Sequence, residues 1–139
     1  MTRRTSKGGA LRAVRTIGAW RVVLVDSVTQ VEASDLDAIV VTGSHGGLSS
    51  ARFAAAVRAR LYVFNDAGVG KGGAGVAGLD WLERRGIPAV AVSAPSARIG
   101  EAADTLKSGI VSARNGLAAA SGWAVGDRLL ERLEGSAPA

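Results

Sequence analysis

The apolar residues of the chain gather in short, nearly continuous runs that polar and glycine-rich segments separate. Four such runs, rich in β-branched and aromatic residues, cover residues 20–26, 38–42, 61–64 and 87–93. Runs of this kind are typical of strands that are buried on both faces of a parallel sheet. A fifth, shorter strand is predicted over residues 110–112.

Apolar positions at helical spacing follow most of these strands. Helices are predicted from Ser49 to Arg60, from Val76 to Gly86, from Ser96 to Lys107 and from Asn115 to Ala120, with a last one after Asp127. Serine, asparagine and aspartate at their starts are good capping residues, and glycine is a common stop signal. Strands and helices therefore alternate along the chain.

This alternation predicts the fold class. Parallel strands need crossover connections, which are right-handed and place helices on the faces of the sheet. We expect a three-layer α/β/α sandwich of Rossmann-like type, with a mostly parallel sheet of four to five strands. In open sheets of this type, ligands bind beyond the carboxyl ends of the strands, near the point where the strand order reverses.

Length and composition narrow the class of protein. With 139 residues and 47% hydrophobic content, the chain has the size of about one domain that needs no cross-links. The absence of cysteine excludes disulfides, thiolate metal sites and a cysteine nucleophile, and it suits a cytoplasmic protein. The apolar runs are shorter than the roughly 20 residues of a membrane span, so no membrane partner is expected.

The net charge of +5 is concentrated at the start of the chain. Residues 1–21 hold six basic residues and no acidic one, which leaves 11 basic and 12 acidic residues in the remainder. We therefore expect a flexible basic arm over residues 1–18, a single α/β domain over residues 19–135 and a frayed end over residues 136–139. Such an arm can touch RNA, a membrane surface or an acidic partner, but a solubilising tail is more common, and nucleic acid is not the expected partner.

Two glycine-rich loops follow predicted strands directly, at residues 43–50 and 65–75. Gly68, Gly70 and Gly73 match a dinucleotide-binding fingerprint, but the strand before them is the third, and no acidic residue follows at the required distance. Lys71 resembles the lysine of a phosphate-binding P-loop, yet Gly72 replaces the serine or threonine of that motif. The interpretation that remains is a general anion site made of free N–H groups, a helix N-terminus and Lys71. A tight crossover or a flexible lid is the alternative.

Three residues of these loops are the candidate catalytic groups. His45, the only histidine, titrates near neutral pH and is predicted as the acid or base. Asp66 is predicted to orient it, although an aspartate after a strand also commonly caps its own turn. Lys71 is predicted to clamp an anion. Together with substrate oxygens, His45 and Asp66 could hold magnesium or manganese weakly, but no metal site made of protein ligands alone is expected.

Further residues at the same sheet edge are predicted to bind the substrate or its anionic group through hydroxyl, amide, guanidinium or backbone N–H donors. They are Ser44, Gly46, Gly47, Asn65, Gly68, Gly70, Ser96, Arg98 and Asn115. For the serines, capping is the alternative role, and for Arg98 the alternative is a salt bridge to Glu101.

These observations support two functions. The first is a small cytoplasmic enzyme, a hydrolase, lyase or isomerase, that acts on a carboxylated or phosphorylated small molecule by acid–base chemistry. The second is an accessory or regulatory subunit that binds a nucleotide or metabolite in the same pocket without turning it over. A homo-oligomer is expected in either case, because a small sheet has exposed edges and the helices are rich in alanine.

Overall fold

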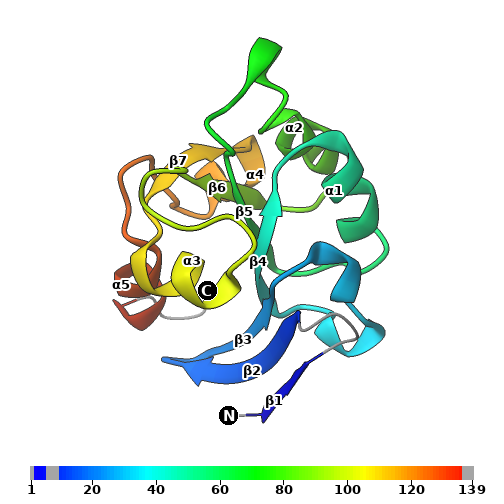
Figure 1. The fold of residues 1–139 in the computed structure, drawn as a ribbon, viewed down its shortest axis with the longest axis vertical. Coiled ribbons are helices and arrows are strands. Elements are labelled where there is room, and N and C mark those ends of the chain that lie inside the picture. Colours follow the sequence, from blue (N-terminus) through cyan, green and yellow to red (C-terminus); the bar gives the residue numbers. More distant parts are fainter. Residues whose placement is uncertain (1, 6–9, 136–139) are drawn as a thin grey trace.

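The computed structural model describes residues 2–5 and 10–135 (Figure 1). They form one mixed sheet whose strands lie side by side in chain order: β1 (Thr2–Thr5), β2 (Leu11–Ile17), β3 (Trp20–Val25), β4 (Ile39–His45), β5 (Leu61–Asn65), β6 (Ala89–Val92) and β7 (Val111–Arg114). The protein is therefore of mixed α/β type, with more strands than the four to five expected.

The sheet is parallel only in its centre. Strands β3 to β6 pair in parallel, whereas β1 with β2, β2 with β3, and β6 with β7 pair antiparallel. The prediction of a mostly parallel sheet is therefore only partly correct. Ile17 and Trp20 pair across a turn of two residues, Gly18 and Ala19, and so short a connection joins only antiparallel strands. Gly18 has the positive φ, +58°, that such a turn requires.

Strand β2 occupies much of the segment in which the sequence predicts a flexible basic arm. Ala13 and Ile17 are buried in the core on one face of the sheet, and Val14 packs against the core on the other. The positive charge of this segment obscures its apolar positions in the sequence. The predicted frayed end, residues 136–139, lies outside the described residues.

Helices cover both faces of the sheet (Figure 1). On one face, α1 (Leu48–Ala54) and α2 (Ala77–Glu83) bury Ala51, Ala54, Leu79 and Leu82 against the strands. On the other, α3 (Ala102–Ser108), α4 (Gly116–Ala120) and α5 (Leu129–Gly135) bury Leu106, Ala118, Leu129 and Leu133. Three short 3₁₀ segments complete the connections, η1 (Val28–Gln30), η2 (Ala33–Asp35) and η3 (Lys71–Gly73). None of the described helices has the length and apolar character that crossing a membrane requires.

The strand order has a consequence for ligand binding. Strands β3 to β6 follow one another across the sheet, so the order does not reverse among the parallel strands. Successive right-handed crossovers in one direction place their helices on one face, as α1 and α2 show. In open α/β sheets the ligand crevice forms where two neighbouring crossovers go to opposite faces of the sheet. The parallel strands of this protein have no such point.

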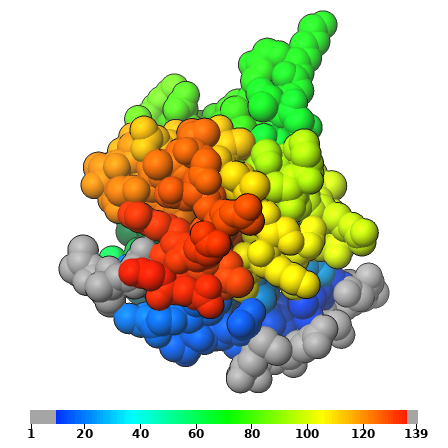
Figure 2. Space-filling view, turned by 90° about the vertical axis from the view of Figure 1, so that its left-hand side faces the viewer, coloured from blue at the N-terminus to red at the C-terminus, as the bar shows by residue number. Residues whose placement is uncertain are grey.

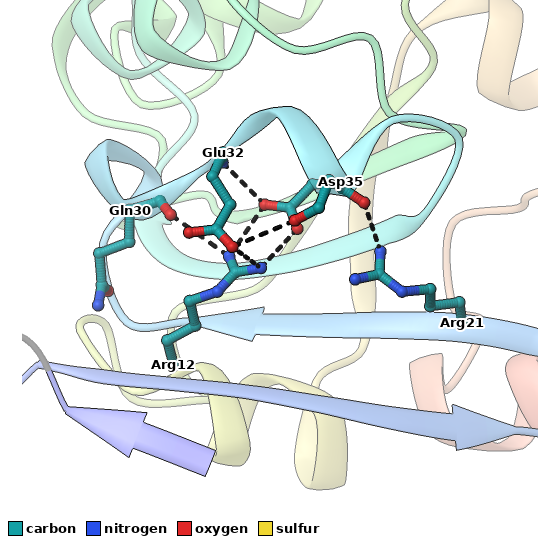
Figure 3. A network of polar contacts seen from close by, with 6 residues as sticks. Arg12, Arg21, Gln30, Glu32 and Asp35 are labelled. Atoms are coloured by element: carbon teal, nitrogen blue, oxygen red, sulfur yellow. Dashed lines mark hydrogen bonds and ion pairs between the residues drawn. The ribbon is translucent and has the colours of Figure 1, made fainter. Parts of the chain in front are cut away.

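A buried ion pair holds β2 to the segment before β4 (Figure 3). The guanidinium of Arg12 donates two hydrogen bonds to the carboxylate of Asp35, at 2.9 and 2.6 Å, and one to the carbonyl of Gln30. Only 5% of Arg12 and 0% of Asp35 are exposed. The hydrogen bond with Asp35 is the main cause that raises the pKa of Arg12, so the guanidinium stays charged.

Candidate functional site

The two glycine-rich loops lie in backbone contact at the carboxyl ends of β4 and β5. The N–H of Gly46 donates to the carbonyl of Asn65 at 3.0 Å, and the N–H of Gly78 donates to the carbonyl of Gly46 at 2.8 Å. A Cβ on Gly46 would lie 2.9 Å from the carbonyl oxygen of Gly75, closer than real Cβ atoms approach. Glycine is thus required for this contact, and the two loops are neighbours.

His45 is held in one orientation by the loop that follows it. Its Nδ1 accepts a hydrogen bond from the N–H of Gly47 at 3.0 Å. A nitrogen that accepts a hydrogen bond carries no proton, so the neutral ring carries its proton on Nε2. The side chain is half-buried. His45 can therefore offer a hydrogen-bond donor through Nε2 without any rearrangement of the loop.

Asp66 serves the architecture of this edge. One carboxylate oxygen accepts hydrogen bonds from the N–H groups of Gly68 and Ala94, at 2.8 and 2.9 Å, and the other accepts the hydroxyl proton of Ser112 at 2.7 Å. Asp66 is only 5% exposed. In the described part of the chain, no hydrogen bond joins it to His45. The predicted histidine–aspartate pair is therefore not formed, and Asp66 connects three segments of the sheet edge instead.

Other predicted binding residues are engaged within the protein. Asn65 donates to the carbonyl of Ala97 and accepts from the N–H of Ala67. The hydroxyl of Ser44 accepts the N–H of Val28 at 2.9 Å. Ser96 shows the same behaviour, because its hydroxyl donates to the carbonyl of Ser93 and accepts from the N–H of Ile110. Each of these three side chains forms at least one hydrogen bond within the protein and so positions the loops.

Arg98 and Asn115 do not join the predicted cluster. Arg98 is 80% exposed in its side chain and lies 3.9 Å from Glu101, the alternative that its sequence position allows. Asn115 is at the opposite edge of the sheet, because β7 runs antiparallel to β6 and ends beside its start. There its amide forms four hydrogen bonds, including those with Ala89 at the start of β6 and with Ile87 just before it, so it stands apart from the other predicted binding residues.

The backbone donors of the predicted anion site are also largely occupied. The N–H groups of Gly46, Gly47 and Gly68 each donate within the protein, to Asn65, His45 and Asp66. At the start of α2, the N–H of Gly78 is bound to Gly46 as described. The helix N-terminus that was expected to face an anion is therefore closed by the neighbouring loop.

The outer part of the second loop is different. The middle of this loop, residues 67–74, projects from the body of the protein (Figures 1 and 2). Two backbone hydrogen bonds close the base of the loop. The N–H of Val69 donates to the carbonyl oxygen of Asp66, and the N–H of Gly75 donates to the carbonyl oxygen of Val69, both at 2.6 Å. At the tip, the N–H groups of Gly70, Lys71 and Gly72 donate to no acceptor among the described residues. Lys71 itself is exposed.

The tip also carries backbone strain. Val69 has a φ of +68°. For a β-branched residue this conformation costs on the order of 1–3 kcal/mol, and the surrounding hydrogen bonds must maintain it. A hollow of about 550 Å³ lies beside the tip, between the loop and helices α1 and α2, and its lining includes Gly72, Leu48, Asp80 and Trp81. The loop therefore combines a fixed base, open donors and adjacent space.

A second cavity, which the sequence analysis missed, lies at the opposite edge of the sheet. It has a volume of about 530 Å³ and is lined by Trp20, Arg60, Trp123 and Arg132, among others. These residues come from four separate segments of the chain. No spacing along the sequence connects them, and only the sheet order brings them together.

The residues present do not form a preassembled metal site. In the described ranges, no group of three or more histidine, aspartate or glutamate side chains is placed to hold a metal ion. Comparisons with protein-family models, with curated proteins and with solved structures find no match to this chain. The geometry described above is therefore the basis for a functional interpretation.

Proposed function

We propose that the protein binds an anionic small molecule, carboxylated or phosphorylated, at the tip of the loop of residues 65–75. The observation that carries this proposal is the set of three successive N–H groups, on Gly70, Lys71 and Gly72, that donate to no described acceptor. Consecutive N–H groups of a turn make a concave site for an oxyanion. The ammonium of Lys71 adds a full positive charge at the same place.

The construction of the loop supports binding rather than a passive crossover. Its base is closed by hydrogen bonds through Asp66, Val69 and Gly75, so the open donors are held on a fixed frame. A preorganised site loses less conformational entropy when a ligand binds. The hollow beside Gly72 provides room for the remainder of the molecule.

Among the two functions that the sequence supports, the structure favours the binding subunit. An acid–base pair needs the base to be oriented by its partner, and Asp66 is fully engaged elsewhere. One observation still supports an enzyme: Gly47 fixes the ring of His45, whose neutral form has an Nε2–H that can donate a hydrogen bond to a substrate oxygen on which negative charge develops. Catalysis is therefore the second candidate function, with His45 as a hydrogen-bond donor to the reacting group.

A thermal-shift screen tests the binding proposal. Nucleotides, sugar phosphates and small di- and tricarboxylates are added, each with and without magnesium. A ligand at a hundred times its dissociation constant stabilises the folded protein by about 2.7 kcal/mol, which raises the unfolding midpoint by several degrees. We expect a shift with one class of anion, its reduction in Lys71→Ala, and its retention in Lys107→Ala, which removes an exposed lysine from α3. Equal shifts in both variants would refute this site.

The catalytic alternative is tested with His45→Ala, which removes the hydrogen-bond donor of the ring. If the anion identified above is turned over, this variant should lose turnover and keep most of its affinity. If only affinity changes, the protein is a binding subunit.

Self-association and a cytoplasmic location stay predictions from the sequence. Light scattering coupled to size-exclusion chromatography measures the first, and cell fractionation the second.

A further inference from the structure

The cavity of about 530 Å³ at the opposite edge of the sheet has the volume of a small-molecule site. It lies where the parallel strands begin, because Trp20 and Leu61 are the first residues of β3 and β5. The projecting glycine loop follows the last residue of β5, at the other end of the same strand. The two places are therefore separate, and a conclusion about one does not depend on the other.

Two arginines line this cavity, each placed over an indole ring. The guanidinium carbon of Arg60 lies 5.3 Å from the ring centre of Trp20, and that of Arg132 lies 5.6 Å from the ring centre of Trp123. A guanidinium that packs on an aromatic ring uses its flat face for this contact, so the N–H groups at its edge stay available to bind an oxyanion. A Cβ on Gly122 would lie 2.6 Å from a terminal nitrogen of Arg132, so the guanidinium packs directly against the backbone at this glycine.

The positive charge of the cavity has no ion-pair partner among the described residues. Neither Arg60 nor Arg132 forms an ion pair with a described carboxylate, and no acidic residue is among the described residues that line the cavity. A cavity with apolar walls and charge of one sign concentrates ions of the opposite sign. Most other lining residues are apolar, including Ile39, Leu61 and Pro88.

The indole N–H of Trp20 supplies an independent observation. It is buried and has no acceptor among the described residues. A buried donor without a partner is unfavourable, and such groups in folded proteins call for an explanation. Because its nitrogen has almost no accessible surface, an acceptor can satisfy it only if the ring shifts when a ligand enters the cavity.

We infer that this cavity binds a small anion with a flat aromatic body, whose ring packs against the indoles and whose oxyanion is bound by Arg60 and Arg132. A carboxylate and a phosphate satisfy the two guanidinium groups in the same way, so the shared chemistry is a planar ring that carries an oxyanion. This site lies outside the proposed function of the glycine loop.

The test uses the fluorescence of anilinonaphthalene sulfonate, a flat aromatic anion, and of phenylnaphthylamine, its uncharged counterpart. We expect saturable binding of the anion, and an affinity about tenfold lower in Arg60→Gln or Arg132→Gln, the loss expected for one charge-assisted hydrogen bond. Arg52→Gln removes an exposed arginine from α1 and should leave the affinity unchanged. Benzoate and phenyl phosphate, added as competitors, distinguish a carboxylate ligand from a phosphate ligand.

A variant that fills the cavity separates binding from effects on folding. Ala120 is exposed, ends α4 and lines the cavity, so Ala120→Trp should abolish binding of the probe without disturbing the core. Lys71→Ala should bind the probe as the wild type does. The inference is overturned if the uncharged compound binds as tightly as the sulfonate, or if Ala120→Trp and both arginine variants keep the wild-type affinity.

Discussion

Replacement of Asp66 by alanine tests the structural role that the geometry gives to this residue. The carboxylate accepts three hydrogen bonds, from Gly68, Ala94 and Ser112. A hydrogen bond to a charged group contributes about 1.5–3 kcal/mol, and the exposed Gly68 can recover part of its loss by binding water. We therefore expect Asp66→Ala to lower the free energy of unfolding by about 3–5 kcal/mol and the unfolding midpoint by roughly 10 °C.

Asp66→Asn is the matched control. Its amide oxygen keeps the two N–H donors, and its amide nitrogen donates to the hydroxyl of Ser112. That hydroxyl can turn its proton toward the carbonyl of Ala91, 3.4 Å away. Asp66→Asn should therefore lower the free energy of unfolding by only about 1 kcal/mol. Urea denaturation measures both variants. The explanation fails if Asp66→Ala unfolds at the wild-type urea concentration, or if both variants lose the same stability.

Three further predictions concern the rest of the fold. Arg12→Met leaves the buried Asp35 unpaired and should cost about 3–5 kcal/mol in urea denaturation, whereas the double variant with Asp35→Leu should cost less than the sum of the single changes. Burial raises the pKa of Tyr62, the only tyrosine. The neutral Tyr62 therefore contributes its full stability to the folded protein below about pH 10, and this contribution is lost as the pH rises further. Absorbance of the tyrosinate should appear only when the protein unfolds at alkaline pH. A Cβ on Gly75 would lie 2.1 Å from the carbonyl oxygen of Asp66. One on Gly72 meets nothing, and alanine there is strained only by its φ of +63°. Gly75→Ala should therefore lower the thermal unfolding midpoint more than Gly72→Ala.

The central strands could be predicted because their residues are apolar on both faces, as in β4 and β5. The outer strands could not. In β2, Arg12 counts as a surface charge until Asp35 is placed beside it, a contact between residues 23 positions apart. The direction of β7 depends on the path of the chain after β6, which residue periodicity does not contain.

The sequence predicted where the glycine-rich loops lie better than it predicted what their side chains do. Glycines mark where backbones touch, so the contact between the loops at Gly46 and Gly75 could be expected. Whether Asp66 faces a ligand or an N–H group depends on the side chains and backbone of β6 and β7, which tertiary structure alone brings near. The cavity between Trp20 and Trp123 had no local signal, because its walls come from distant segments.

An amide-resolved NMR titration tests the central proposal most directly. Inorganic phosphate and small di- and tricarboxylates are added in turn to the full chain, and the backbone amide signals are followed. The account predicts saturable shifts of Gly70, Lys71 and Gly72 with one class of anion, while the internally bonded amides of Gly46 and Gly68 move little. Shifts that never saturate, or that leave these three amides unchanged, would contradict it.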